Sequence, residues 1–149
     1  MKKIYIGADS AGYNLKEEIK EYLTTTGHEV IDCGTDSEAS CHYPIFANAV
    51  CKGVKEDEDA CGILVCGTGI GMSMCANKHN GIRAAVCGDT FSARMTRMHN
   101  DANVLCLGAR VIGSMLALDI VDIFLNNKFD GGRHQIRVDM MTEIENSQK

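Results

Sequence analysis

Five apolar runs of strand length alternate along this chain with segments whose apolar residues recur at helical spacing. The runs cover residues 2–8, 29–33, 61–65, 82–86 and 103–107, and the helical segments cover residues 13–26, 44 to about 55, the stretch up to about 78, 89 to about 99, and 114–125. Short apolar runs favour buried strands, and recurrence at i, i+3 and i+4 favours amphipathic helices. This alternation predicts a doubly wound α/β protein with a five-stranded parallel sheet between two layers of helices.

The last part of the chain, from about Gly132, carries Ile136, Met140, Met141 and Ile144 at helical spacing. Such a stripe is typical of a helix with one apolar face. We therefore expect a C-terminal helix that packs on the body of the protein or on a neighbouring subunit. At 149 residues, the chain is expected to form a single domain over residues 1–149.

Charge and hydropathy exclude two classes of partner. The chain has 15 Lys and Arg against 20 Asp and Glu, a net charge of −5, and no basic face, so no nucleic-acid partner is expected. The uncharged stretch Ala60–Asn77 is interrupted by glycines and polar residues, so no membrane span is expected. Because the N-terminus runs directly into a strand pattern and not into a signal peptide, we expect a cytoplasmic protein that binds small molecules or copies of itself.

The eight cysteines contain no Cys-x-x-Cys pair, which excludes zinc-ribbon and thioredoxin-type sites, and most are expected to be buried, reduced packing groups. Cys66 differs because it ends an apolar run directly before the turn Gly67–Gly71. A helix that starts at such a turn presents unpaired N–H groups and favours an anion. Cys66 is therefore a candidate thiolate base or nucleophile, the alternative being a structural thiol.

The glycine turn does not match the better-known phosphate loops. Met72 replaces the third glycine of Gly-x-Gly-x-x-Gly, and no Lys followed by Ser or Thr completes a P-loop. Asp89, about twenty residues further on, keeps a dinucleotide-binding interpretation open, since an acid there binds ribose in such folds.

Two pairs of residues outside the turn are candidates for substrate contacts. Arg133 and Arg137 stand four residues apart and share a helix face, which suits a bridging phosphate, although pairing with Asp130 or Asp139 is an alternative. His99-Asn100 ends a predicted helix. We expect His99 to reach the carboxyl edge of the sheet with Asp9 and Cys66, or to lie on a neighbouring subunit's face; the alternative is a capping or surface histidine.

These motifs, taken together and in order, resemble the type B ribose 5-phosphate isomerases and the related galactose 6-phosphate isomerase subunits. The resemblance covers essentially the whole chain, through Asp9, Tyr43-Pro44, Cys66–Gly71, Asn77-Lys78, Gly81–Arg83, His99–Asp101, Gly108-x-Arg110 and Gly131–Val138. It implies a Rossmann-like fold and a cofactor-free, metal-free aldose–ketose isomerase of the pentose phosphate pathway. It also implies a homodimer or a dimer of dimers with sites between subunits.

The resemblance further implies roles for individual residues. Cys66 would move the proton between C1 and C2 of ribose 5-phosphate and ribulose 5-phosphate, His99 would open the sugar ring, and Asp9 would help to orient that end of the substrate. The enediolate would be stabilised by Gly67, Thr68, Gly69, Ile70 and Gly71, and the substrate would also be held by Tyr43, Asn100, Arg110, Arg133 and Arg137.

One departure from the family pattern leaves the preferred sugar open. Ser10 stands where most members carry a histidine, so a hexose 6-phosphate isomerase, of the allose or galactose 6-phosphate type, is an alternative. A non-catalytic nucleotide-binding module is a further alternative. Because this chain carries the thiol, His99-Asn100 and the arginines together, a homo-oligomer suffices.

Overall fold

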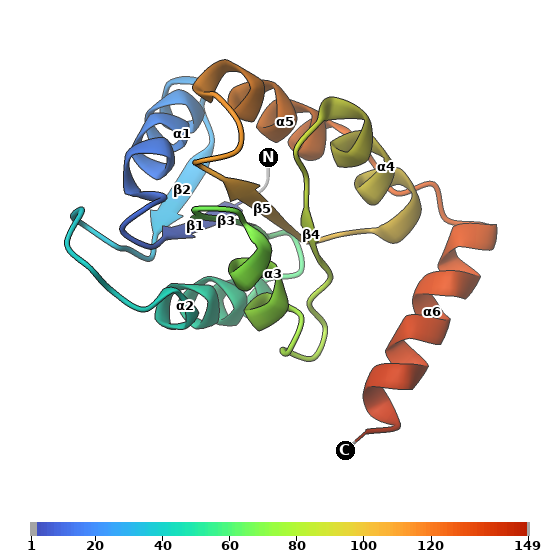
Figure 1. Ribbon diagram of the computed structural model, residues 1–149. Helices are drawn as coiled ribbons and strands as arrows, with labels where there is room; N and C mark the ends of the chain where they lie inside the picture. Colours follow the sequence, from blue (N-terminus) through green and yellow to red (C-terminus); the bar gives the residue numbers. More distant parts are fainter. Residues whose placement is uncertain (1–2, 149) are drawn as a thin grey trace.

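The computed structural model describes residues 3–148, in which five strands form one parallel sheet flanked by helices (Figure 1). The strands are β1 (Lys3–Ala8), β2 (Glu29–Asp32), β3 (Cys61–Cys66), β4 (Ala84–Val86) and β5 (Val104–Gly108). The helices are α1 (Tyr13–Thr25), α2 (Tyr43–Glu56), α3 (Ile70–Ala76), α4 (Thr90–Asn100), α5 (Ser114–Asn126) and α6 (Arg133–Asn146). Lys2, where the predicted first strand begins, lies outside the described residues.

The strands lie in the order β2-β1-β3-β5-β4, and each neighbouring pair is parallel. Helices α1, α4 and α5 cover one face of the sheet and α2 and α3 cover the other (Figure 1). The expected three-layer α/β/α architecture with a five-stranded parallel sheet is confirmed. None of the helices among the described residues is long and apolar enough to cross a membrane.

The central strand β3 is buried on both faces, as expected for a parallel sheet covered by helices. Successive side chains of a strand point to opposite faces. Ile63 and Val65 join the core beneath α1 and α5, whereas Leu64 and Cys66 join the core beneath α2 and α3. The Cys66 side chain therefore lies on the α2 and α3 side of the sheet.

Two predicted boundaries differ from the structure by two residues, whereas the others that the structure describes agree within about one residue. α3 ends at Ala76 and not near Lys78, and β4 begins at Ala84 and not at Ile82. The Asn77 side chain bonds both backbone groups of Ala84, accepting from its N–H at 2.8 Å and donating to its C=O at 2.9 Å. The Asn77 side chain thereby links the residue after α3 to the first residue of β4. After Ala76 the chain tightens into a turn, in which the N–H groups of Lys78 and His79 bond carbonyls three residues back, and Arg83 N–H bonds the Asn103 side chain and not a backbone carbonyl.

Helix α6 stands away from the layered body (Figure 1). Its apolar side chains Ile136, Met140 and Ile144 are 64%, 57% and 60% exposed. It contacts its own chain near its start, where Asp130 N–H bonds the Met98 carbonyl, and near its end, where Glu145 accepts from Gly81 N–H. The expectation that this stripe packs on the body is wrong, and the alternative, a neighbouring subunit, stays a prediction.

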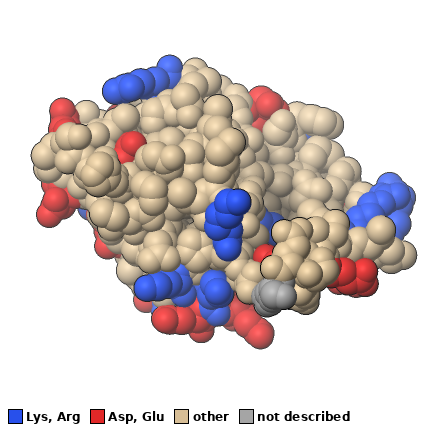
Figure 2. Space-filling view, turned by 60° about the horizontal axis from the view of Figure 1, so that its bottom comes forward, with Lys and Arg blue, Asp and Glu red and all other residues tan. Residues whose placement is uncertain are grey.

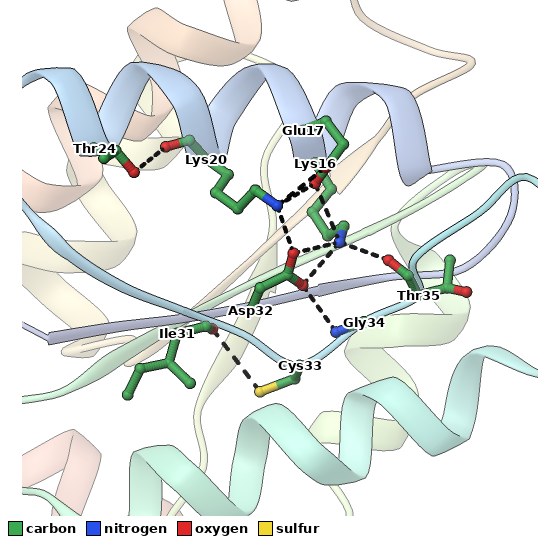
Figure 3. Close-up of polar contacts among 9 residues, drawn as sticks. All are labelled: Lys16, Glu17, Lys20, Thr24, Ile31, Asp32, Cys33, Gly34 and Thr35. Carbon is green, nitrogen blue, oxygen red and sulfur yellow. Dashed lines mark hydrogen bonds and ion pairs between the residues drawn. The ribbon is translucent and has the colours of Figure 1, made fainter.

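Lys16 of α1 is a buried cation, although helical spacing alone predicts that it faces solvent. Lys16 is fully buried, and its Nζ donates to both oxygens of Asp32, at 2.8 and 2.9 Å, and to the Thr35 carbonyl at 2.6 Å (Figure 3). Burial raises the pKa of Asp32, but hydrogen bonds from Lys16 and Lys20 outweigh it and hold that pKa below its ordinary value. The pair ties α1 to the end of β2, next to Ala8, whose backbone bonds Gly34 and Thr35.

Replacing this cation should destabilise the fold. Lys16→Met keeps the apolar stem but leaves the buried Thr35 carbonyl without a donor and the Asp32 carboxylate, which is 28% exposed, with Lys20 as its remaining ammonium. This should lower the free energy of unfolding by about 2 kcal/mol. Lys20→Met is the matched control, because Lys20 also bonds Asp32 at 2.8 Å but is 34% exposed, and it should cost less than about 1 kcal/mol. Urea denaturation measures both; equal losses would contradict this account.

Candidate active site

The carboxyl ends of three neighbouring strands bring the first group of predicted site residues together. In the sheet, Ala8 pairs with Val65 and Cys66 pairs with Gly108, so β1, β3 and β5 end at the same edge. Asp9 follows β1, Cys66 ends β3, and Arg110 follows β5. This edge is where parallel α/β sheets bind ligands.

The glycine turn places a backbone N–H group against the Cys66 sulfur. Gly69 N–H donates to Cys66 Sγ at 3.1 Å, and only 6% of Cys66 is exposed. Gly69 has φ +80°, and an added Cβ would lie 3.0 Å from the Leu107 carbonyl carbon, so this donor position requires glycine. Ile70 N–H donates to Thr68 Oγ1 at 3.2 Å. The sulfur therefore faces a main-chain donor at the sheet edge.

The loop after β1 packs beside this turn. Asp9 N–H donates to the Val65 carbonyl at 3.2 Å, and Asp9 Oδ1 accepts from Gly12 N–H at 3.0 Å. These two bonds fix the carboxylate at the end of β1. Ser10 is half-buried in the same loop.

Arg110 and Tyr43 complete this edge. Arg110 N–H bonds the Gly67 carbonyl at 3.0 Å, and the arginine side chain lies along Gly67, with Cδ 3.6 Å from where a Cβ would stand. The Tyr43 ring lies so close to Gly71 that a Cβ there would be 2.7 Å from the ring. We name as the carboxyl-edge group the residues Asp9, Ser10, Tyr43, Cys66, Gly67–Gly71 and Arg110.

The structure places His99 and Asn100 at the other edge of the sheet. α4 starts beyond the carboxyl end of β4 and returns, so its last turn lies before β5. Val104, the first residue of β5, pairs with Gly62 and Ala84 near the starts of β3 and β4. The expectation that His99 reaches the carboxyl edge within its own chain is therefore wrong; a place on a neighbouring subunit's face stays a prediction.

His99 meets the first turn of α6 there. Its ring stacks on His134, with the ring centres 4.1 Å apart and the planes within 8°. Burial lowers the pKa of His134, and the nearby charges of His99, Arg133 and Arg137 lower it further. We name as the amino-edge group His99, Asn100, Arg133, His134 and Arg137.

Sequence reasoning missed His134, although it lies between the two arginines in sequence. Those arginines are exposed, and neither forms an ion pair with Asp130 or Asp139 among residues 3–148. Asp139 instead accepts from Gln135 at 2.8 Å. Two unpaired guanidiniums four residues apart leave room for an anion between them.

His99, Asp130 and His134 have ligand atoms within 4.8 Å of one another, the only such group with metal-ligand chemistry among residues 3–148. Stacked rings hold their nitrogen lone pairs in parallel planes and do not direct them to one point, unlike the ligands of a tetrahedral zinc site. The geometry therefore suits packing of the two rings better than coordination of an ion.

Burial makes three other thiols hard to ionise. Burial raises the pKa of Cys51 to about 12 and that of Cys87 to about 11, and it raises the pKa of Cys106 well above its ordinary value. At neutral pH these three groups are neutral packing atoms. All eight cysteines are free of disulfides.

Together, the fold and the edge residues define a Rossmann-like α/β protein with a thiol and a glycine turn at the carboxyl edge of its sheet. The chain belongs to the ribose/galactose isomerase family, whose model matches residues 4–141. This confirms the family expected from the motifs.

Individual relatives match over nearly the whole chain. Ribose-5-phosphate isomerase B of Escherichia coli K12 is 50% identical over 145 residues, which are 97% of each chain. The solved ribose-5-phosphate isomerase B of Clostridium thermocellum is 54% identical with a TM-score of 0.97 over 99% of each chain. A Mycoplasma genitalium enzyme of the same name, solved with bound ribulose-5-phosphate, is 42% identical with a TM-score of 0.93, over 97% of this chain and 96% of that one.

The lowered pKa of His134 predicts a pH-dependent stability. Since the unfolded histidine, with a pKa of about 6.5, binds a proton more readily than the folded one, stability should fall as pH drops from 7 toward 5. His134→Asn should lose that part of the slope, whereas His28→Asn, in the loop before β2, should keep it. Thermal melting at pH 7.5, 6.5 and 5.5 measures this, and equal slopes in all three proteins would contradict it.

Proposed function

We propose that residues 1–149 form one domain that interconverts ribose 5-phosphate and ribulose 5-phosphate without a cofactor, in cytoplasmic carbohydrate metabolism. The observation that carries the proposal is the contact between Cys66 Sγ and Gly69 N–H, in a chain 50% identical to a ribose-5-phosphate isomerase. A sulfur base beside main-chain donors has the two parts that this chemistry needs.

The carboxyl-edge group supplies the proton transfer. Isomerisation removes a proton next to a carbonyl, so negative charge develops on the substrate oxygens as the enediolate forms. Cys66 takes the proton from one carbon and returns it to the next, while N–H groups of Gly67–Gly71 and the Thr68 hydroxyl stabilise the oxygens. Each well-placed donor is typically worth about 3 kcal/mol in such transition states. Asp9, Ser10, Tyr43 and Arg110 bind the sugar alongside.

The amino-edge group supplies ring opening and phosphate binding. His99 moves the proton that opens the sugar ring, Asn100 binds the sugar, and Arg133 and Arg137 hold the phosphate. Binding energy at the phosphate, remote from C1 and C2, can be used to position the reacting carbons.

Because the two groups lie at opposite edges of one chain, we propose a homodimer, or a dimer of dimers, in which each site joins the two groups from different subunits. The exposed apolar stripe of α6 supports this, as do Ile70 and Met74 of α3, which are 50% and 64% exposed. Figure 2 shows the side of the molecule toward α2 and α3, where uncharged atoms dominate and charged groups are scattered. A two-fold interface would cover such surfaces on both copies at once.

Two alternatives are less well supported. The relatives compared above are named for ribose 5-phosphate, and one binds ribulose 5-phosphate, which favours a pentose over a hexose substrate. For a nucleotide-binding module, Asp89 would have to bind a ribose. Its carboxylate instead caps α4, accepting from Ser92 N–H at 2.7 Å and from the Ser92 hydroxyl at 2.9 Å.

Loss of the sulfur should stop turnover and spare binding. Cys66→Ala should lower kcat for ribose 5-phosphate by about 10² to 10⁴, the usual cost of losing a general base, while Kd for the sugar phosphate changes by no more than a few fold. Cys75→Ala, a half-buried thiol on α3, is the control and should keep kcat. Steady-state kinetics and calorimetry measure the two quantities. Near-normal turnover by Cys66→Ala would refute the role.

Mixing two inactive variants tests the shared site. Cys66→Ala and His99→Asn damage different edges, so a mixed dimer contains one intact site and one doubly damaged site. After unfolding and refolding together, an equal mixture should recover about a quarter of wild-type activity, because half of the dimers are mixed. Each variant refolded alone is the control. No recovery, with mixed dimers detected by mass, would place both groups of a site in one subunit.

A further inference from the structure

The residue that follows His99 and Asn100 has an unusual backbone. Asp101 ends α4 in the left-handed conformation, with φ 48° and ψ 43°, and among residues 3–148 it is the only non-glycine residue with positive φ. This conformation is uncommon outside glycine, although Asp and Asn adopt it more readily than other residues, and here surrounding contacts hold it.

Arg83, which directly precedes β4, holds the backbone of this turn. Its Nε donates to the carbonyls of Asn100 and Asp101, at 3.0 and 3.1 Å, and its Nη2 donates to the Asp101 carbonyl at 2.8 Å and to Asp101 Oδ2 at 3.2 Å. Arg83 N–H in turn donates to Asn103 Oδ1 at 2.8 Å. One guanidinium thus joins the peptide after Asn100 to the sheet.

Arg97 holds the same turn from inside the protein. Its Nη1 donates to Asp101 Oδ1 at 3.0 Å and to the Ala102 carbonyl at 2.6 Å, and only 7% of its side chain is exposed. Its guanidinium packs over the Phe124 ring of α5, 5.6 Å from the ring centre. The Asp101 carboxylate therefore bridges two cations, one on each side of the turn.

Ending a helix does not require this arrangement. α1 ends with backbone bonds from Thr26 and Gly27 to its last carbonyls, and Gly27 has φ +90° at no cost in strain. α4 also ends with a backbone bond, from Ala102 N–H to the Thr96 carbonyl at 3.1 Å, but there two arginines and an aspartate with positive φ additionally fix the peptide next to Asn100. The additional contacts fix the orientation of the backbone at His99 and Asn100, the two residues before Asp101.

We infer that Arg83, Arg97 and Asp101 form a clamp that positions His99 and Asn100 for the substrate. The three act through those residues and do not touch the sugar. The expected change in kinetics rests on the proposed function. The expected change in geometry does not: without the clamp, the His99 ring should lose its place against His134.

The test uses Asp101→Asn and Arg83→Gln, because the loss of the buried Arg97 is expected to unfold the protein. Asparagine tolerates the left-handed conformation but lacks the charge that joins the arginines, and the Arg83 side chain is 26% exposed. For each variant, kcat/KM for ribose 5-phosphate is measured together with the ring signals of the five histidines by NMR. Asp89→Ala is the matched control, since it removes the side-chain cap at the other end of α4.

We expect Asp101→Asn and Arg83→Gln to lower kcat/KM about 10- to 100-fold, the scale of a misplaced catalytic group, with shifts of the His99 and His134 signals but not of His28 and His79. Arg83→Lys should recover part of the loss. Asp89→Ala should leave kcat/KM within about twofold of wild type and the His99 and His134 signals in place, even where it lowers the melting temperature as much.

Unchanged ring signals and an unchanged kcat/KM in both clamp variants would overturn the inference, and so would losses no larger than those of Asp89→Ala. His99→Asn separates this failure from that of the proposed function. If His99→Asn turns over normally, the proposed role of His99 is lost, while the ring signals of the clamp variants still decide whether the clamp exists.

Discussion

The parallel register of β3 between β1 and β5 is the constraint on which the proposed chemistry depends. Pairing of Ala8 with Val65 and of Cys66 with Gly108 brings three chain segments to one edge, and the small residues of the glycine turn let them approach closely. The bond from Gly69 N–H to Cys66 Sγ exists only because this turn fits against the backbone of β5. A one-residue slip would turn the sulfur to the opposite face.

The same topology divides the candidate site residues of one chain into two separate groups. A helix that follows a parallel strand must return to the opposite edge, so α4 carries His99 and Asn100 away from Cys66. α6 then begins beside His99. The stacked rings of His99 and His134, the guanidiniums of α6 and the turn at Asp101 form a second group, which has its own stabilising contacts. Each group is held together by contacts of its own within one chain, although neither contains all the predicted parts of a site.

The sequence predicted the strands and helices because apolar spacing is a local property, and it predicted Cys66 because a thiol directly before a glycine turn is a local pattern. Strand order is not local, and neither is the edge at which a helix ends, which is why His99 was misplaced. Lys16 was missed because its partner Asp32 lies on another element, where a long apolar stem can reach it. The stripe of α6 predicted an apolar contact without saying which chain supplies it.

The position of α6 has a consequence for how activity depends on assembly. If sites are shared between subunits, as proposed, a newly made chain has no activity until it associates with a second copy, and the association constant sets the concentration at which catalysis begins. A chain with a truncated α6 would still offer an intact Cys66 to its partner, while withholding phosphate binding from the centre to which its own helix belongs. Damage to α6 in one copy would then inactivate the site that contains the Cys66 of the other, undamaged copy.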